Sequence, residues 1–137
     1  MLRNSIYMDG VVAEASGMLA SRRINVPENA DRITYVTRAD CAAAAAAVLA
    51  TPGHENRAYD ITGPAAVGPR EIAAAASAVA GVPIEIVATP AGPPSPFGGA
   101  AVATPSDDFE ALVGRPALSV RAFLEAHRDT LSRTARP

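Results

Sequence analysis

Four polar side chains near the start of the chain are the best candidates for binding a ligand: Arg3, Asn4, Ser5 and Tyr7. The amide of Asn4 and the hydroxyl of Ser5 both donate and accept hydrogen bonds, so they suit a ligand that carries a carbonyl group. The alternative is a structural role, in which the polar groups end a strand and Arg3 lies on the surface. No residue of the chain is predicted to be catalytic.

The remaining titratable side chains give weaker indications. Asp40 is better explained as an acid at the start of a helix than as a general base. His54 and His127 are far apart in the sequence, and His54 is expected to lie in a solvated turn. We therefore predict no metal site. An acidic cluster suits a helix start and only weakly a cation site; it comprises Asp107, Asp108 and Glu110.

The composition excludes several classes of function. All twelve basic residues are arginines, which removes the lysine that a Schiff base or a P-loop requires. A net charge of −2 predicts neither nucleic-acid nor membrane binding. Cys41 precedes an alanine run, which favours a small buried residue. Because no signal peptide and no apolar run of about 18 residues is found, a cytoplasmic location is expected.

Strands alternate with helices along the sequence, which predicts a single α/β domain over residues 1–137 with a partly parallel sheet of three to four strands. Two extended segments flank the polar turn 27–31 in the manner of a hairpin. A stretch rich in proline and glycine, 89–105, is predicted to be a flexible loop. The expected extended segments are 2–8, 24–26, 32–36, 58–62 and 83–88.

Helix boundaries are marked by capping residues. Thr37 is predicted to be an N-cap, with Asp40 completing a capping box. Proline at the first helical position and a terminal glycine delimit a helix from Pro69 to Gly81. Further helices are expected after Asp9, before Gly114, and as one continuous last helix after Ser119.

Several segments together resemble the NmrA-like proteins, which are atypical short-chain dehydrogenases that include quinone oxidoreductases. Leu2 to Tyr7 resembles their LRNGxY stretch, and Thr37 to Ala44 resembles their TRxDxA helix start. Residues 52–63 resemble an xGHxGKxYxLTG stretch, 68–73 match the helix that follows, and 114–116 match a GRP turn. The matches occur in order and cover most of the chain.

The resemblance implies a partial Rossmann-like sheet, equivalent to the C-terminal lobe of the NmrA-like fold. In this family a glycine-rich turn in the other half binds NAD(P)H. The present sequence has no G-x-G-x-x-G pattern, because Gly63 and Gly68 are five residues apart with Pro64 between them. We therefore expect a truncated domain that does not bind NAD(P)H alone.

The family also implies a place for the four polar candidates, because the equivalent strand end faces the nicotinamide and substrate cleft. The Tyr-x-x-x-Lys pair of ordinary short-chain dehydrogenases is absent, since the chain has no lysine. Tyr35 and Tyr59 are therefore expected to be core or rim aromatic residues.

Three functions remain open. The first is a component of an NAD(P)H-dependent, quinone reductase-like oxidoreductase, without independent hydride transfer. The second is a module that binds a small ligand or a protein, and the third is an inactive gene fragment. A sheet that lacks neighbouring strands exposes an edge, so a homodimer or a partner chain that covers the sheet is expected.

Overall fold

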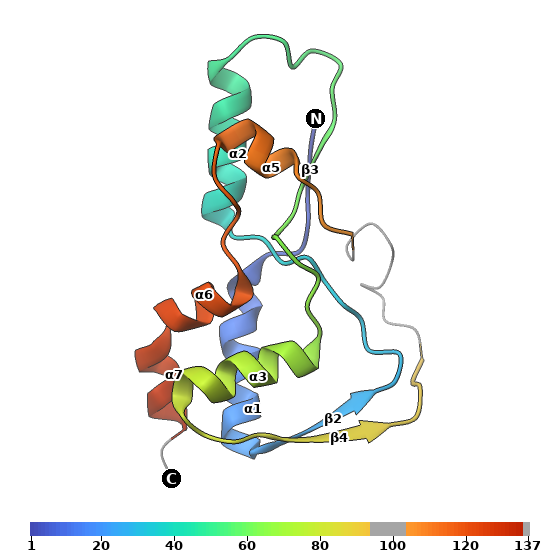
Figure 1. Cartoon of the computed structure of the whole chain (residues 1–137), viewed down its shortest axis with the longest axis vertical. Coiled ribbons are helices and arrows are strands. Elements are labelled where there is room, and N and C mark those ends of the chain that lie inside the picture. The colour runs from blue at the N-terminus through green and yellow to red at the C-terminus, as the bar shows by residue number, and fades with distance from the viewer. Residues whose placement is uncertain (94–103, 136–137) are drawn as a thin grey trace.

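The arrangement of strands and helices is given by a computed structural model, which describes residues 1–93 and 104–135 (Figure 1). The alternation of strands and helices confirms the predicted α/β class. In chain order the elements are β1 (Leu2–Asn4), η1 (Met8–Gly10, a 3-10 turn), α1 (Val11–Ser21), β2 (Arg23–Pro27), α2 (Arg38–Ala50), β3 (Tyr59–Ile61), α3 (Pro69–Ala80), β4 (Glu85–Thr89), α5 (Asp108–Val113), α6 (Val120–Ala126) and α7 (Arg128–Thr134).

The described strands form two separate parallel pairs. β1 pairs with β3, with Leu2 opposite Tyr59 and Asn4 opposite Ile61. β2 pairs with β4 over five residues, from Arg23 opposite Glu85 onward. The four described strands agree with the predicted number, but they make two sheets of two strands where one sheet was expected.

The predicted hairpin between 24–26 and 32–36 is wrong. Ile33 forms an antiparallel bridge to Val67, and Val36 forms a parallel bridge to Tyr7. A hairpin would pair only the three residues 24–26, whereas β4 gives a partner to all five residues of β2. The longer pairing satisfies more main-chain donors and acceptors.

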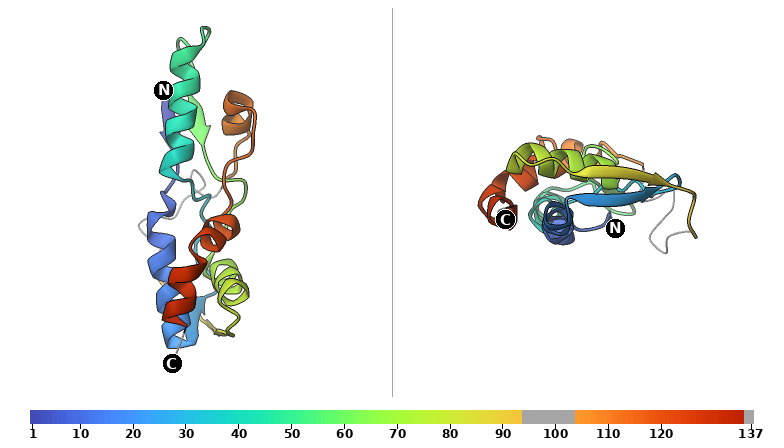
Figure 2. Two further views of the ribbon diagram at one scale, coloured as in Figure 1. Left: turned by 90° about the vertical axis from the view of Figure 1, so that its left-hand side faces the viewer. Right: turned by 90° about the horizontal axis from the view of Figure 1, so that it is seen from below.

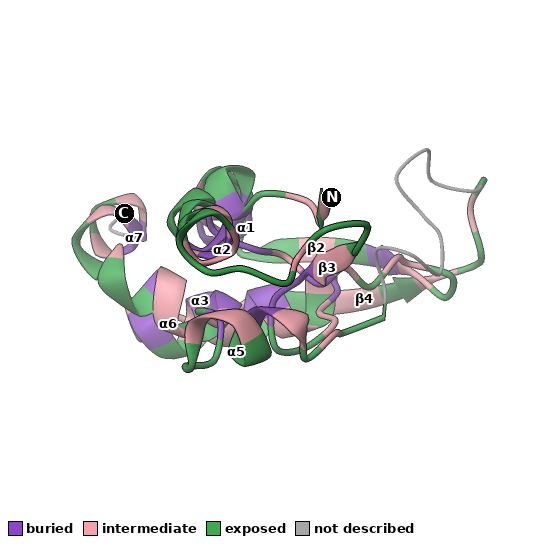
Figure 3. Ribbon diagram, turned by 90° about the horizontal axis from the view of Figure 1, so that it is seen from above, coloured by how far each residue is buried: buried purple, intermediate pink, exposed green. Residues whose placement is uncertain are grey.

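The molecule is elongated, and its elements divide into two lobes along the long axis (Figure 2). The lower lobe contains α1, β2, α3, β4, α6 and α7, and its helices bury one continuous apolar core. Figure 3 shows buried positions on the helices of this lobe. The buried residues of this core are Met8, Val11, Ala15, Met18, Leu19, Ile72, Ala73, Ala76, Val79, Val120, Leu124, Leu131 and Ala135.

The upper lobe contains β1, α2, β3 and α5 and has a smaller core. Phe109 of α5 is its largest fully buried side chain, with 1% of its surface exposed. Cys41 is buried in the same cluster, as predicted, and its other buried members are Val36, Ala44, Ile61 and Ala117. Burial and the neighbouring Asp40 carboxylate raise the pKa of the Cys41 thiol, which favours an unreactive thiol.

Most helix boundaries follow the predicted caps. The Thr37 hydroxyl accepts the N–H of Asp40 at 3.0 Å, and α3 has Pro69 at its first position. Gly81 and Gly114 end α3 and α5 with φ of 70° and 77°, in the left-handed region that glycine favours. The capping box at Thr37 is only half formed, because the Asp40 carboxylate is bonded to Leu118 instead.

The predicted single C-terminal helix is divided at His127 into α6 and α7. The ring Nδ1 of His127 donates to the carbonyl of Phe123 at 2.8 Å, while its main-chain N–H bonds to Leu124. The His127 ring thus binds the Phe123 carbonyl, which in a continuous helix would accept the main-chain N–H of His127. Of the predicted loop 89–105, Thr89 belongs to β4, whereas 94–103 lie outside the described residues.

Candidate functional site

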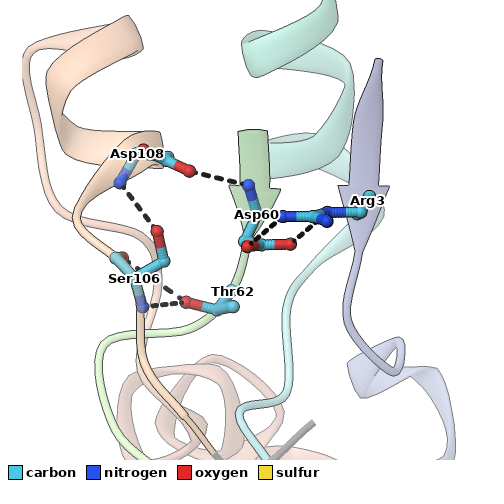
Figure 4. A network of polar contacts seen from close by, with 5 residues as sticks. All are labelled: Arg3, Asp60, Thr62, Ser106 and Asp108. Atoms are coloured by element: carbon cyan, nitrogen blue, oxygen red, sulfur yellow. Dashed lines mark hydrogen bonds and ion pairs between the residues drawn. The ribbon is translucent and has the colours of Figure 1, made fainter. Parts of the chain in front are cut away.

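The first predicted site residue, Arg3, lies in a cross-strand ion pair. Its Nε and Nη2 donate to the two carboxylate oxygens of Asp60, each at 2.7 Å (Figure 4). The parallel register puts these residues directly opposite one another on β1 and β3. Both side chains are about half exposed, so the pair aligns the strands but adds little stability, on the order of 0–1 kcal/mol.

A chain of polar contacts continues from Asp60 to α5 (Figure 4). The Asp108 carboxylate accepts the main-chain N–H of Asp60 at 2.7 Å, and the Ser106 hydroxyl accepts the N–H of Asp108 at 3.2 Å. The Thr62 hydroxyl accepts the N–H of Ser106 at 2.9 Å. Asp108 therefore joins β3 to α5 rather than contributing to a cation site.

Asn4 and Tyr7 form a second polar group at the carboxyl end of β1. The Asn4 amide is 3.5 Å from the Tyr7 hydroxyl, a long contact. The guanidinium carbon of Arg38 lies 4.7 Å from the centre of the Tyr7 ring, and its Nε donates to Asp9 at 2.8 Å. Arg38 could not be found as a neighbour of Tyr7 from the sequence, because the contact depends on where α2 begins relative to β1.

Ser5 is more enclosed than the other three candidates. Its hydroxyl is 3.1 Å from that of Thr34, which is fully buried. Arg3, Asn4, Ser5 and Tyr7 thus make three different sets of contacts. Their assignment to a ligand pocket stays a prediction.

A small cavity of about 120 Å³ opens beyond the carboxyl end of β3. Ligands of open α/β sheets bind at such strand ends. Gly63 lines this cavity. A Cβ at position 63 would lie 2.1 Å from the carbonyl oxygen of Tyr35. The cavity is lined by Thr62, Gly63, Pro64, Pro105, Ser106, Asp107, Phe109, Glu110, Pro116 and Ala117.

Asp40 is placed where it stabilises the junction of the lobes. Only 2% of its surface is exposed; its carboxylate accepts the N–H of Leu118 at 2.9 Å and pairs with Arg115 at 2.8 Å. Both partners belong to the segment between α5 and α6. The predicted preference for a helix-start acid over a general base agrees with this geometry, although the partners were not foreseen.

His54 lies half-buried in the irregular segment after α2, and both of its ring nitrogens have partners. Nε2 lies 2.8 Å from the Thr51 hydroxyl, and Nδ1 lies 2.8 Å from the Tyr59 hydroxyl. Tyr35 and Tyr59 are partly buried at the rims of the two cores, as predicted. Within 1–93 and 104–135, no cluster of His, Cys, Asp and Glu could hold a metal ion.

Each of the long described helices begins with an acidic residue. A helix N-terminus that binds a pyrophosphate group uses free main-chain N–H groups, and a negative charge beside them opposes a bound anion. The three described helices longer than eight residues each have an acid in the first turn: Glu14 in α1, Asp40 in α2 and Glu71 in α3. The Glu71 carboxylate already accepts the Gly68 N–H at 2.9 Å.

Known proteins similar to this chain include reductases and a nucleoside-diphosphate-sugar epimerase from Staphylococcus aureus. No protein-family model matches it. It is 32% identical over 142 residues to an NAD(P)H azoreductase from Xenophilus azovorans, a match that covers 88% of this chain and 50% of that protein. Triphenylmethane reductase from Citrobacter sp., solved with NADP(H), superimposes with a TM-score of 0.67 at 25% identity, covering 98% of this chain and 52% of the reductase.

A further structural match concerns the fold alone. An NADPH-dependent quinone oxidoreductase from Escherichia coli superimposes with a TM-score of 0.72 at 21% identity, covering 90% of this chain and 53% of the oxidoreductase. The architecture is therefore a partial Rossmann-like α/β fold.

The similarities confirm the resemblance seen in the sequence. Over most of its length the chain is similar to one half of an NAD(P)H azoreductase and of a triphenylmethane reductase, as expected for a partial NmrA-like protein. It spans about half the length of the relatives that it matches. Among the described residues, no helix has the length and hydropathy needed to cross a membrane.

Proposed function

We propose that residues 1–137 form the substrate lobe of an NAD(P)H-dependent reductase and act together with a glycine-rich half that binds the dinucleotide. The observation that carries this proposal is the outer edge of the β1–β3 sheet, with which no strand of residues 1–93 and 104–135 pairs. Two parallel strands of three residues do not make an independent sheet. Parallel sheets are stable when further strands and helices cover them.

The main chain of β1 shows which groups a neighbouring strand would use. Ser5 donates to Ile61, and Met1 accepts from Tyr59, so these residues face β3. Successive residues of a strand direct their N–H and C=O groups to opposite edges. The main-chain groups of Leu2 and Asn4 therefore face away from β3, toward the position of an adjacent strand.

The location of the dinucleotide half outside this chain is supported by the sequence and by the helix ends. No glycine-rich phosphate loop occurs between Met1 and Pro137. The acids in the first turns of α1, α2 and α3 oppose a pyrophosphate. Hydride transfer by this chain alone is therefore not part of the proposal.

Complementation tests the proposal. The chain alone is titrated with NADPH in a calorimeter, and then mixed with the half of the Xenophilus azoreductase that it does not match. We expect no saturable binding by the chain alone, a 1:1 complex with the added half, and NADPH oxidation in the mixture when an azo dye is supplied. NADPH binding by the chain alone, or two proteins that remain separate in light scattering, would contradict the proposal.

Paired variants show whether complex formation uses the open edge. Asn4→Pro removes the outward N–H, whereas Asn4→Ala removes the same side chain and keeps that donor. We expect Asn4→Pro to weaken the complex at least tenfold more than Asn4→Ala. Equal affinities would exclude pairing at this edge, and circular dichroism checks that both variants fold.

The same variants test a second copy as the alternative occupant. Without the added half, the open edge favours pairing between two copies of the chain. We expect the chain alone to form a dimer in light scattering and Asn4→Pro to return it to a monomer. A wild-type monomer at high concentration would show that the edge is protected in another way.

A further inference from the structure

The surface of α2 is more exposed than its sequence predicts. Every residue from Cys41 to Ala50 is apolar, so this part of the helix has no polar side to face water. A helix that is apolar on all sides is normally buried on all sides. Ala42, Ala46 and Leu49 are nevertheless exposed, and Leu49, at 86%, is the most exposed large apolar side chain of the described residues. Such a surface suits contact with another unit.

Two ion pairs identify what lies on each side of α2. Arg38 and Asp40 are two residues apart, so their side chains point to nearly opposite sides of the helix, about 200° apart. Asp40 pairs with Arg115, which follows α5, and Arg38 pairs with Asp9, which follows β1. The left view of Figure 2 likewise shows α5 on one side of α2 and β1 on the other. One side of α2 is therefore covered by α5, and the other is the side of β1.

Leu49 lies on the β1 side of α2. Ala42, Ala45 and Leu49 continue the line of Arg38 along the helix, because residues three or four apart are neighbours on a helix surface. Ala42 is exposed, Ala45 is half-buried, and Leu49 is almost fully exposed. We call these three residues the α2 stripe. The stripe lies on the same side as the outer edge of β1, with which no described strand pairs.

The handedness of parallel sheets indicates what would cover the stripe. α2 belongs to the crossover between the parallel strands β1 and β3. Crossovers between parallel strands are right-handed, so successive crossovers in one direction place their helices on the same face of the sheet. A parallel strand at the outer edge of β1 would therefore bring its helix beside α2, against the stripe. About half of each matched reductase lies outside this chain and can supply both elements.

We propose that the α2 stripe binds a helix of the dinucleotide half, whose neighbouring strand pairs with β1. The two alanines allow the two helix axes to approach closely, and Leu49 packs between side chains of the facing helix. The proposal rests on the function proposed above, because it names a second contact surface for the same partner. The facing helix should carry apolar side chains without charge at the contact.

Affinity for the unmatched half of the Xenophilus azoreductase tests the stripe. Leu49→Asp places a charge in the stripe, whereas Ala50→Asp places the same charge one residue later, about 100° around the helix. Both positions are exposed, so neither change disturbs a core, and circular dichroism checks that both variants fold. We expect Leu49→Asp to raise the Kd of the complex about tenfold more than Ala50→Asp, and Leu49→Met to retain the affinity of the wild type.

Nuclear magnetic resonance of the wild-type chain gives a second measurement that needs no variant. The methyl signals of Leu49 should shift when the added half binds. Leu118 is the matched control, because it is 38% exposed and lies on the α5 side of α2, where its N–H bonds to Asp40. Its methyl signals should not shift. Shifts at Leu118 without shifts at Leu49 would overturn the proposal.

The outcomes separate the stripe from the edge of β1. If Asn4→Pro weakens the complex and Leu49→Asp does not, the partner pairs with β1 without a helix on α2, and only the present proposal is wrong. If the wild-type chain forms no complex, the proposed function is wrong as well. If Leu49→Asp lowers the mass of the chain alone in light scattering but leaves its affinity for the added half unchanged, a second copy covers the stripe, and the proposal is wrong.

Discussion

The two lobes of the molecule are stabilised in different ways. Thirteen described residues form the buried core of the lower lobe, whereas six form that of the upper lobe. In the upper lobe, elements that share little apolar surface are joined by polar contacts. Examples are the ion pair between Arg3 and Asp60 and the hydrogen bond between Asp108 and Asp60. We propose that such a lobe completes its structure through contacts with another unit at the outer edge of β1, which no described strand pairs.

The largest effect is expected from removing the central side chain of each core. Phe109→Ala should cost about 3–5 kcal/mol and Leu124→Ala about 2–5 kcal/mol, since both side chains are fully buried. We expect Phe109→Ala to open only the upper lobe, because its contacts lie in the small cluster, and Leu124→Ala to unfold the whole chain. Hydrogen exchange at α2 and β3, compared with α1 and α3, measures this difference. Loss of protection in both lobes of Phe109→Ala would show one cooperative unit.

The next effect concerns the junction of the lobes. Asp40→Asn keeps the size of the side chain but loses its charge toward Arg115 and its charge-assisted bond to Leu118. A hydrogen bond to a charged group is worth about 1.5–3 kcal/mol, so urea denaturation should show a loss of that order. Glu55→Gln, an exposed acid on the loop after α2, is the matched control and should be neutral. Equal stability of the two variants would show that the lobes do not depend on this tie.

A smaller loss of stability is expected where the main chain of Gly63 packs against the main chain of Tyr35. In Gly63→Ala the added methyl group would meet the Tyr35 carbonyl oxygen, so the main chain must separate there at a cost of about 1–3 kcal/mol. Gly17→Ala is the opposite case, because no atom lies within 4 Å and the residue is inside α1. Helix propensity then predicts a gain of about 1 kcal/mol. Thermal unfolding should show a lower Tm for Gly63→Ala and a higher Tm for Gly17→Ala than for the wild type.

Local rules were enough to place most elements of the fold. Thr37, Pro69, Gly81 and Gly114 act within a few residues of themselves, and each begins or ends a helix as predicted. The failures involve competition between partners distant in sequence. β2 pairs with β4 and not with the nearer segment 32–36. This pairing depends on tertiary packing, which no local sequence pattern specifies.

The same limit applies to the candidate site. The sequence indicated Arg3 but not Asp60, because their pairing follows from the register of β1 on β3. It indicated Tyr7 but not Arg38, which depends on where α2 begins relative to β1. A resemblance between sequences assigns residues to a region, whereas three-dimensional placement decides which of them touch.

The smallest expected effect is a pH dependence confined to the lower lobe. Burial raises the pKa of Glu71, but hydrogen bonds from Gly68 and from its own main chain, together with Arg32, more than offset this and lower its pKa below the ordinary value of 4.5. A lowered folded-state pKa stabilises the fold above pH 4.5, and this contribution is lost as pH falls through the folded-state value.

Glu71→Gln should therefore be less stable than the wild type at pH 7, with a difference that shrinks as the pH falls below about 4.5. The side chain is partly exposed, so the difference is expected to be a fraction of a kcal/mol. Glu28→Gln, an exposed acid without a described ion pair, serves as the control. Urea denaturation at a series of pH values, monitored at α3, measures the difference in stability. A difference that does not change with pH would assign the role of Glu71 to packing. The two lobes would then respond to acid in the same way.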